Sequence, residues 1–186
     1  MSNLVFTGCE FSTVATATGQ RRHAVVAGKR VRTVDIHAHC SVPKALALMG
    51  MKLEGPGLRP DLDMESAVDL RLATMDAQAL DVAALSINPN WYKLGRDQAE
   101  AVIRIQNEAL AEACARHPDR FVAFASVALQ HPDLAAAQLE EGVRKYGLRG
   151  AAIGGIVAGE EISDPRFHPF WAKAEELGVL VFIHPQ

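Results

Sequence analysis

Residues Val31-Arg-Thr-Val-Asp-Ile-His-Ala-His39 are the stretch on which the fold assignment depends. The stretch begins with β-branched and apolar side chains, which favour a buried strand, and it ends on two histidines. A strand that is apolar at its start and polar at its end is typical of one that leaves a core and enters a site. We therefore predict a strand over residues 31–39 whose last residues line a functional site.

Further along the chain, short apolar segments alternate with segments that have helical spacing. Strands are predicted over residues 81–87, 121–127, 148–153 and 179–184. Helices are predicted over residues 63–78, 97–116, 132–146 and 169–177, and a Gly- and Pro-rich loop over residues 41–60. Because the strands are apolar throughout, we expect an α/β fold with a parallel sheet buried on both faces. A (β/α)₈ barrel of the TIM type and an open, doubly wound sheet both fit this pattern.

Residues 1–30 are rich in Ser, Thr, Gly and Arg, and their apolar positions are scattered. We interpret them as an N-terminal extension or a loose hairpin, in which residues 24–26 pair with residues 31–34. The alternating strands and helices occupy residues 31–186. The chain is therefore expected to consist of this N-terminal region followed by an α/β unit.

The composition limits the class of protein. Of the 186 residues, 49% are hydrophobic and 22% are charged, and the formal net charge is −3. These values are ordinary for a soluble globular protein and exclude a strongly basic nucleic-acid binder. We recognise neither an export signal nor an apolar segment of the roughly 18 residues that a membrane span needs. Three widely spaced cysteines (Cys9, Cys40 and Cys114) predict reduced thiols and a cytoplasmic location.

Three histidines lie at the ends of predicted strands. His37 and His39 are two residues apart, so their imidazoles point to the same face of a strand. His184 ends the last predicted strand, and the carboxyl ends of parallel strands meet at one edge of a sheet. Because neutral imidazoles are good ligands for a divalent ion, we predict a metal site formed by these three residues. Asp35 shares the parity of the pair and is a candidate to lie beneath it, whereas the residues expected to pack against helices are Ile36, Ala38 and Cys40.

Other residues are weaker candidates. Trp91 and Tyr92 follow the second long strand and either line a substrate pocket or cover the rim of the barrel. Lys44, Lys52 and Arg59 could meet an anionic substrate, although solvated loop charges are the commoner explanation. The remaining histidines are interpreted as boundary, capping or surface residues: His23, His117, His131 and His168. Neither a dinucleotide-binding nor a nucleophile-elbow glycine motif is present.

Several motifs together resemble those of the amidohydrolase superfamily, and specifically its aminocarboxymuconate-semialdehyde decarboxylase-like branch (amidohydrolase family 2). The resemblance covers about residues 31 to 186. Its motifs are Val34-Asp-Ile-His-Ala-His39 followed by Ser41-Val-Pro-Lys44, Arg71-Leu-Ala-Thr-Met-Asp76, Asp81-Val-Ala-Ala-Leu-Ser86, Pro118-Asp-Arg-Phe121, residues 148–154, and Asp164-Pro-Arg-Phe-His-Pro-Phe-Trp171 with the closing His184-Pro185.

The resemblance implies a (β/α)₈ barrel, of which this chain contains about the first five βα units. It also implies one divalent metal, most often zinc and alternatively manganese, with His37, His39 and His184 among its ligands. Family members complete the site with a histidine after the sixth strand and an aspartate after the eighth. Both would lie beyond Gln186, so the resemblance assigns no catalytic residue within these 186 residues. Arg59 is a candidate for the arginine that binds substrate carboxylates in the decarboxylase, although the surrounding loop is shorter and different.

We therefore expect a metal-dependent, non-oxidative decarboxylase of a small carboxylic acid. The alternatives are a metal-dependent hydrolase of the same superfamily and a catalytically inactive fragment that serves only as an assembly module. We expect the 186 residues alone to have very weak activity or none, and the complete enzyme to be a homodimer that binds neither nucleic acid nor membranes.

Overall fold

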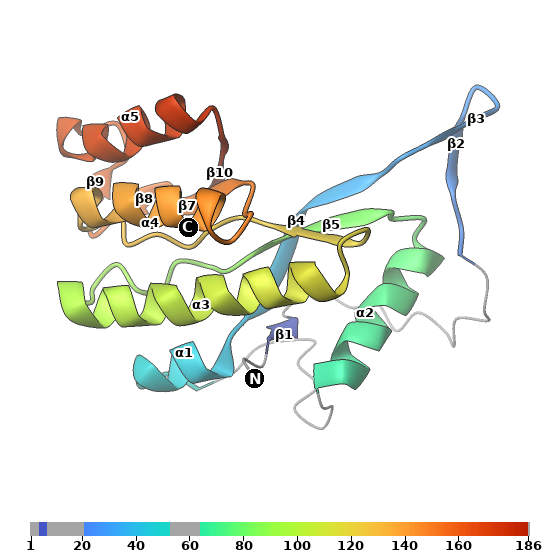
Figure 1. Cartoon of the computed structure of the whole chain (residues 1–186), viewed down its shortest axis with the longest axis horizontal. Helices are drawn as coiled ribbons and strands as arrows, with labels where there is room; N and C mark the ends of the chain where they lie inside the picture. The colour runs from blue at the N-terminus through green and yellow to red at the C-terminus, as the bar shows by residue number, and fades with distance from the viewer. Residues whose placement is uncertain (1–3, 7–20, 53–63, 186) are drawn as a thin grey trace.

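The computed structural model describes residues 4–6, 21–52 and 64–185. Its sheet is built from strands that run parallel and follow one another in sequence order (Figure 1). An isolated parallel bridge between Ala125 and Ala151 connects the two halves of this sheet. The strands, in their spatial order, are β4 (Val34–Ser41), β5 (Val82–Ser86), β6 (Phe121–Ala123), β7 (Gly150–Gly154) and β10 (Leu180–His184).

The order of the strands distinguishes between the two predicted architectures. In a doubly wound sheet the order reverses beside the first strand, whereas in a TIM-type barrel each strand pairs with the next one in the sequence. The sequential order β4-β5-β6-β7-β10 is that of a barrel. The chain therefore has part of the (β/α)₈ fold, as predicted.

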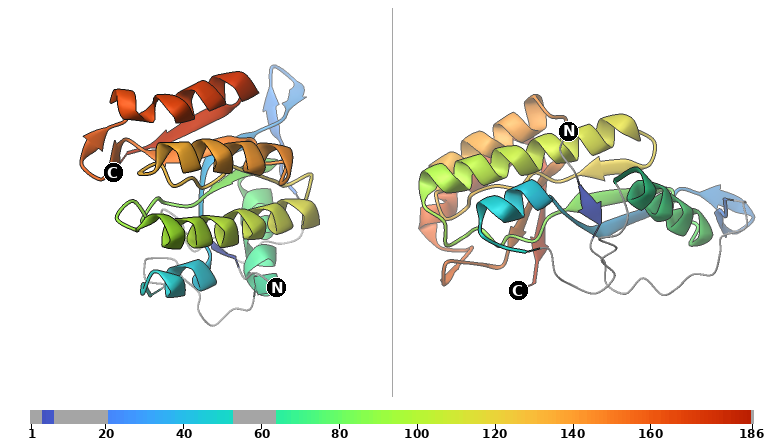
Figure 2. Two further views of the ribbon diagram at one scale, coloured as in Figure 1. Left: turned by 60° about the vertical axis from the view of Figure 1, so that its left-hand side comes forward. Right: turned by 90° about the horizontal axis from the view of Figure 1, so that it is seen from below.

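Helices cover one face of this sheet. Figure 2 shows α3 (Arg96–Arg116), α4 (Pro132–Arg144) and α5 (His168–Leu177) side by side on that face. Helix α2 (Met64–Ala77) precedes β5. Each of these helices lies within two residues of its predicted bounds. Helix α1 (Pro43–Leu48) was missed, because the glycines and prolines that follow it made the whole segment read as a loop.

The two faces of the sheet are packed differently. The helix side holds a large core in which Leu85, Phe121, Leu139 and Ile153 are among the fully buried side chains. The concave side holds a much smaller cluster of three buried residues, with Val122 and Phe182 packed against it: Ala84, Phe124 and Ala152. The helices and the sheet thus form the stable part of the fold, and the concave side is left open for a site.

The N-terminal region contributes a hairpin and a strand. β2 (Ala24–Val26) pairs with β3 (Lys29–Val31), so the partner lies earlier than the predicted residues 31–34. Ala27 and Gly28 both have positive φ, and such a two-residue turn places Val26 opposite Lys29. Because residues 29–31 belong to the hairpin, the first barrel strand begins at Val34 rather than at residue 31. β1 (Val5–Phe6), which the sequence did not predict, pairs antiparallel with the end of β4.

Asp81 fastens the base of the hairpin to the sheet. Its buried carboxylate accepts hydrogen bonds from Arg21 Nη2 at 2.8 Å, Arg30 Nη2 at 3.1 Å and the Thr33 backbone N–H at 3.0 Å. The Thr33 N–H is the main reason why the pKa of Asp81 falls to about 2, and Arg30 and Arg21 lower it further. This carboxylate therefore holds residues from two segments at the amino-terminal end of the strands.

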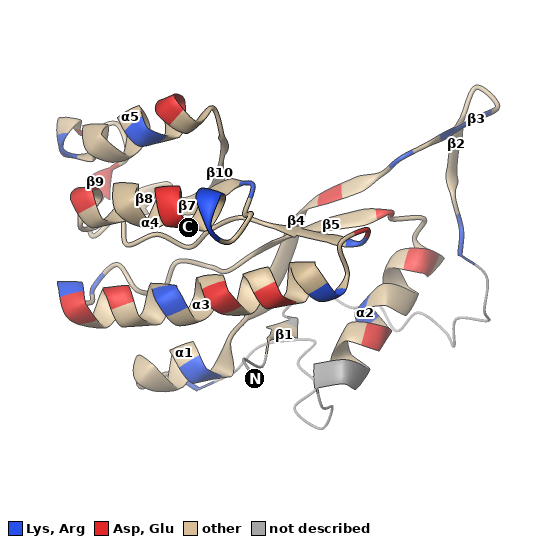
Figure 3. Cartoon of the chain, viewed as in Figure 1, with Lys and Arg blue, Asp and Glu red and all other residues tan. Residues whose placement is uncertain are grey.

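The remaining short elements lie between β7 and α5: β8 (Ile156–Val157), β9 (Glu160–Glu161) and a 3₁₀ helix over Pro165–Phe167. Charged residues of both signs are spread over α3, α4 and α5 (Figure 3). Within the described ranges no helix is both long and apolar enough to span a membrane. Cys40 and Cys114 carry free thiols, and Cys9 lies outside the described residues.

Candidate metal centre

Three imidazoles converge at the carboxyl ends of β4 and β10. The Nε2 atoms of His39 and His184 lie 3.2 Å apart, and the ring centroids of His37 and His39 are separated by 4.5 Å. The His184 ring lies 5.0 Å from that of His37 and 4.9 Å from that of His39. One ligand nitrogen from each residue falls within 4.8 Å of the others. The structure therefore brings together the three histidines that the sequence predicted as ligands.

The curvature of the sheet explains how residues so far apart in sequence meet. In the parallel register, His39 pairs with Ser86, the last residue of β5, and His184 pairs with Gly154, the last residue of β7. Both imidazoles therefore lie near the carboxyl ends of the strands. β4 and β10 are the first and last strands of the curved parallel sheet, and their ends face each other across its concave side. Side chains from the two strands therefore meet at the carboxyl-terminal mouth of the barrel, where TIM-type folds place their sites.

Asp35 does not share the face of His39, contrary to the alternation expected from the sequence. The register of β4 against β5 shifts between Asp35 and Ala38, so one extra residue interrupts the alternation of faces. Asp35 accepts a hydrogen bond from the His37 backbone N–H at 3.1 Å and pairs with Arg71 of α2 at 3.3 Å. Ala38 is buried as predicted, but Ile36, in the irregular segment, is 46% exposed.

The electrostatics of the cluster favour neutral imidazoles. Burial, followed by the neighbouring His37 and His184, lowers the pKa of His39 to about 4. His39 is therefore uncharged at neutral pH, and a neutral imidazole has a lone pair to offer a metal. In the described part of the chain, neither His39 Nδ1 nor the hydroxyl of its neighbour Ser86 has a hydrogen-bond partner, although both are buried.

The donor set fits a divalent ion. Two nitrogen ligands of a tetrahedral ion, each about 2.0–2.1 Å from the metal, lie roughly 3.3 Å from each other. The 3.2 Å between His39 Nε2 and His184 Nε2 agrees with this spacing. Three imidazoles at the carboxyl ends of the strands, one of them held neutral, therefore form a group that could bind a divalent metal.

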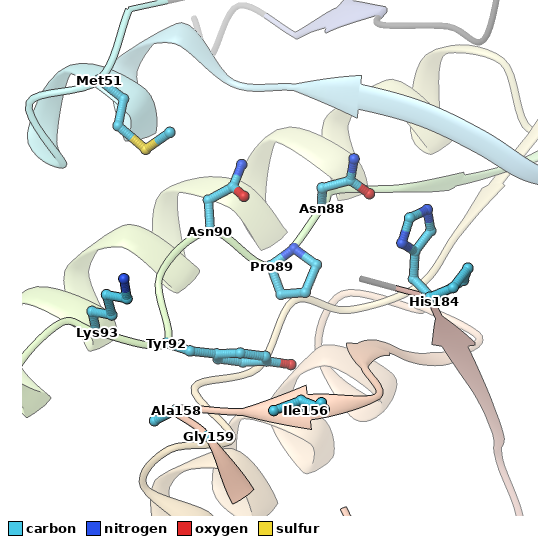
Figure 4. A pocket seen from close by; sticks show the side chains of 11 residues that line it. Met51, Asn88, Pro89, Asn90, Tyr92, Lys93, Ile156, Ala158, Gly159 and His184 are labelled. Carbon is cyan, nitrogen blue, oxygen red and sulfur yellow. The ribbon is translucent and has the colours of Figure 1, made fainter. Parts of the chain in front are cut away.

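A cavity of about 750 Å³ adjoins His184 (Figure 4). Its volume lies in the range of small-molecule sites. The described residues that line it come from the segment after α1, the loop after β5, the β8–β9 region and the end of β10: Met51, Asn88, Pro89, Asn90, Tyr92, Lys93, Ile156, Ala158, Gly159, His184 and Pro185. Of the three clustered histidines, His184 is the one that lines this cavity.

Tyr92 forms part of the cavity wall, and its position is fixed. Its hydroxyl oxygen accepts a hydrogen bond from the Gly154 backbone N–H at 3.0 Å. Burial raises the pKa of the phenol to about 12, so the hydroxyl stays protonated at neutral pH. Since the oxygen already accepts from Gly154, its own hydrogen is directed elsewhere. The tyrosine therefore presents a rigid ring and a neutral hydroxyl.

Comparison with known proteins identifies the family. The profile of the family described as Amidohydrolase matches residues 34–186. The chain belongs to this family. It is 36% identical over 126 residues to the gamma-resorcylate decarboxylase of Rhizobium radiobacter, an alignment that covers 63% of this chain and 38% of that protein. It is also 29% identical over 119 residues to the 2-amino-3-carboxymuconate-6-semialdehyde decarboxylase of Dictyostelium discoideum (63% of this chain, 33% of that protein).

A solved amidohydrolase-family structure shows the same architecture. The 5-carboxyvanillate decarboxylase of Novosphingobium aromaticivorans, with bound manganese and 3-methoxy-4-hydroxy-5-nitrobenzoic acid, matches with a TM-score of 0.62 and 31% identity. The match covers 75% of this chain and 42% of that one. The chain thus spans less than half the length of these relatives. The resemblance to the decarboxylase-like branch is confirmed.

Among the other predicted residues of this amidohydrolase, Trp91 has a different place from the one expected. It is fully buried, and its indole N–H donates to the Val127 carbonyl at 2.9 Å, so it packs in the core rather than facing a substrate. Its neighbour Tyr92 lines the cavity instead. The exposed Lys44 and Lys52 are not among the described lining residues, and Arg59 lies outside the described residues.

The catalytic histidine and aspartate of the family have no counterpart among the described residues of the cluster. The sequence expectation placed both beyond Gln186, and Gln186 itself lies outside the described residues, which end at Pro185. Within the described ranges, the group of His, Cys, Asp and Glu side chains that could hold a metal here consists of the three histidines. The described residues thus offer three candidate metal ligands and a cavity wall, and the group that transfers the proton stays a prediction.

Sequence reasoning missed three polar residues near the site. Arg71, which pairs with Asp35, is a cation within the apolar pattern of α2, and that interruption was a usable signal. Asn88 and Asn90 line the cavity from the loop after β5. Their position directly after a strand pointed to the site mouth of a barrel, but asparagines beside a proline are equally typical of turns.

Proposed function

We propose that this amidohydrolase chain provides the metal-binding first part of a metal-dependent, non-oxidative decarboxylase that acts on a small aromatic carboxylic acid. The observation that carries the proposal is the histidine cluster, in which His184 also lines a cavity of about 750 Å³. Two of the relatives reported above are named as decarboxylases of aromatic carboxylates, gamma-resorcylate and 5-carboxyvanillate. Both names support decarboxylation as the reaction and an aromatic carboxylic acid as the substrate.

The proposed cofactor is one divalent ion held by His37, His39 and His184. Zinc is the first candidate because imidazole nitrogens suit it well. Manganese is the second candidate, and it is the ion bound in the 5-carboxyvanillate decarboxylase. The homodimer and the cytoplasmic location expected from the sequence stay predictions.

The proposed mechanism divides the work between the ion and the side chains of this chain. When bound, a divalent ion supplies Lewis-acid polarisation of a substrate oxygen. Buried His39 is held neutral, so it would bind the ion without first losing a proton. Tyr92, fixed by the Gly154 N–H, orients the aromatic ring of the acid against the cavity wall. The loop after β5 and strand β8 form further parts of the wall against which the acid would lie.

Metal binding by the isolated chain tests the first part of this proposal. We expect the wild-type chain to bind about one divalent ion, measured by titration calorimetry and elemental analysis. His39→Ala is expected to weaken binding at least about 100-fold, because removing a ligand costs more than removing one of its supporting contacts. His23→Ala removes an exposed imidazole outside the cluster and serves as the matched control. Unchanged affinity in a folded His39→Ala variant would contradict the proposed metal site.

Product analysis tests the reaction class. The test uses a protein that contains a barrel as long as those of the relatives. When it is incubated with 2,6-dihydroxybenzoate (gamma-resorcylate), we expect the release of carbon dioxide and the formation of a phenol. Release of a hydrolysis product without carbon dioxide from a candidate ester or amide would favour the hydrolase alternative instead. The 186 residues alone are expected to give very weak turnover or none, and full turnover by them would show that expectation to be wrong.

A further inference from the structure

The cavity beside the histidines has two chemically different ends. His184 lies at one end and Lys93 at the opposite end, with the loop of Asn88, Pro89 and Asn90 between them (Figure 4). Among the described residues that line the cavity, Lys93 is the sole Lys, Arg, Asp or Glu. The described wall therefore carries a positive charge without a carboxylate to balance it. Such a wall attracts an anionic group.

The backbone that carries Lys93 is held firmly on both sides. The preceding Trp91 and Tyr92 are buried, and the Trp91 carbonyl accepts hydrogen bonds from the Leu94 N–H at 2.9 Å and from the side chain of Gln130 at 2.8 Å. The hydroxyl of Tyr92 is fixed by the backbone N–H of Gly154, the last residue of β7. Lys93 itself is exposed at the cavity, so a rigid loop presents a flexible cation. A lysine on a fixed backbone at the wall of a cavity is well placed to bind an anionic group of a ligand.

Lys93 differs in its ion pairing from the cations on the helices. Arg residues of α3 and α4 pair with acidic neighbours, as Arg96 does with Asp133 at 2.7 Å and Arg144 with Glu140 at 3.3 Å. Within the described ranges, no carboxylate forms an ion pair with Lys93. Its ammonium group is therefore available to a ligand that enters the cavity.

We propose that Lys93 is a specificity-determining residue that binds a second acidic group of the substrate, at the end of the cavity away from the histidines. The preferred substrates are then aromatic acids with two carboxylates, one of which leaves while the other is held by Lys93. An acid with a single carboxylate, placed near the histidines, would leave Lys93 without a partner. This inference rests on the proposed function and adds the substrate class to it.

Two ligands that differ in one carboxylate test the proposal. The first is 3-methoxy-4-hydroxy-5-nitrobenzoic acid, in which a nitro group replaces the leaving carboxylate and the second carboxylate is retained. The second is 2-methoxy-6-nitrophenol, the same ring without that carboxylate. Their affinities for the manganese-loaded chain are measured by titration calorimetry for the wild type, Lys93→Met and Lys44→Met. Lys44→Met makes the same chemical change at an exposed lysine that is not among the described lining residues.

We expect Lys93→Met to weaken binding of the benzoic acid about fivefold, as for a solvent-accessible ion pair. Binding of the nitrophenol, and both affinities of Lys44→Met, are expected to stay unchanged. Higher ionic strength should reduce the wild-type preference for the acid. Lys93→Arg, which keeps the positive charge, should preserve most of the preference for the benzoic acid over the nitrophenol.

The outcomes separate this proposal from the proposed function. If both ligands bind and Lys93→Met changes neither affinity, or changes both equally, the role of Lys93 is overturned and the decarboxylase site stands. If neither ligand binds to the metal-loaded wild-type chain, both the proposed function and the role of Lys93 are overturned. Far-ultraviolet circular dichroism of each variant confirms that the fold is retained.

Discussion

On the helix side of the sheet, side chains such as Leu85 and Ile153 are completely buried, whereas on the concave side only Ala84, Phe124 and Ala152 form a buried cluster among the described residues. Large apolar side chains are also exposed at the edges of the parallel sheet. Several of the exposed large apolar residues lie on the outer strands β4 and β10: Val34, Ile36, Leu180 and Ile183. The same sheet therefore has one closed face and one open face.

This difference separates stability from function within the chain. The hydrophobic contacts that hold the strands and helices together lie on the closed face, since burial of apolar surface is the main favourable contribution to folding. The histidines and the cavity lie at the open face and contribute few buried apolar contacts. Substitutions on the two faces should therefore have distinct effects, and the predictions below test this from the largest effect to the smallest.

The largest effect is expected from Gly150→Ala, which disturbs the sheet that both faces share. Gly150 has a φ of 142°, and a Cβ there would lie 1.8 Å from the Leu180 carbonyl oxygen, so β7 and β10 could not remain paired. We expect a loss of at least about 4 kcal/mol in the free energy of unfolding, measured by urea denaturation.

Gly178→Ala is the matched control, because Gly178 also has a positive φ but has open space around its Cβ position. Its cost is expected to be about 1 kcal/mol, the penalty for a left-handed alanine. Equal losses for the two variants would contradict the steric argument.

The comparison between faces is sharpened by a pair of core substitutions. Ile153→Ala on the closed face is expected to cost about 2–5 kcal/mol, because Ile153 is fully buried and its removal leaves a cavity. Phe182→Ala on the open face removes a larger side chain, yet it should cost only about 1–2 kcal/mol because the ring is only partly buried. A larger loss for Phe182→Ala than for Ile153→Ala, measured by the same urea denaturation, would overturn the division between the faces.

Asp81→Asn should have a moderate effect that depends on pH. The pKa of this carboxylate is lowered from 3.8 to about 2, so the stability that it contributes is fully present above pH 4 and is lost as the pH falls toward 2. We expect the variant to have a lower Tm than the wild type at pH 7 and the difference to shrink between pH 4 and pH 2. Asp119→Asn, at an exposed position near the same arginines, is the control and should change little.

The smallest effect on stability is expected at the edges. Ile183→Lys replaces a side chain that is 48% exposed on the outer strand β10, so the free energy of unfolding should change by no more than about 0.5 kcal/mol. The added charge should, however, reduce self-association through the strand edge, as measured by sedimentation velocity. An unchanged degree of association would show that β10 is not the edge through which copies of the chain meet.

Much of the fold was predictable because its signals are local. The buried strands are short and apolar, the helices have regular apolar spacing, and Gly178 ends α5 in the left-handed conformation. Because the carboxyl ends of parallel strands meet at one edge of a sheet, the sequence alone predicted that His37, His39 and His184 lie together. The apolar pattern alone left barrel and open sheet as alternatives, the family resemblance implied the barrel, and the pairing order of the strands confirms it.

The features that could not be predicted depend on contacts between distant segments. Trp91 and Tyr92 are adjacent in one turn, and only the position of the Val127 carbonyl explains why the first is in the core and the second in the cavity. The place of Asp35 depends on a register shift that no periodicity reveals. The sequence shows that Lys93 is charged, but it does not show that Lys93 lines a cavity whose described residues include no carboxylate.

The register shift in β4 has a consequence for how the histidine cluster can be adjusted. Asp35 lies beside Ala83 and His39 beside Ser86, so β4 uses one residue more than β5 over the same distance. Deleting Ile36 would remove the extra residue from β4. The pairings of Asp35 with Ala83 and of His39 with Ser86 would stay the same, so the faces to which these side chains point would not change. The residue that would move is His37, which lies within the irregular segment. A change in chain length at this point is thus a way to reposition one imidazole while the other two stay in place.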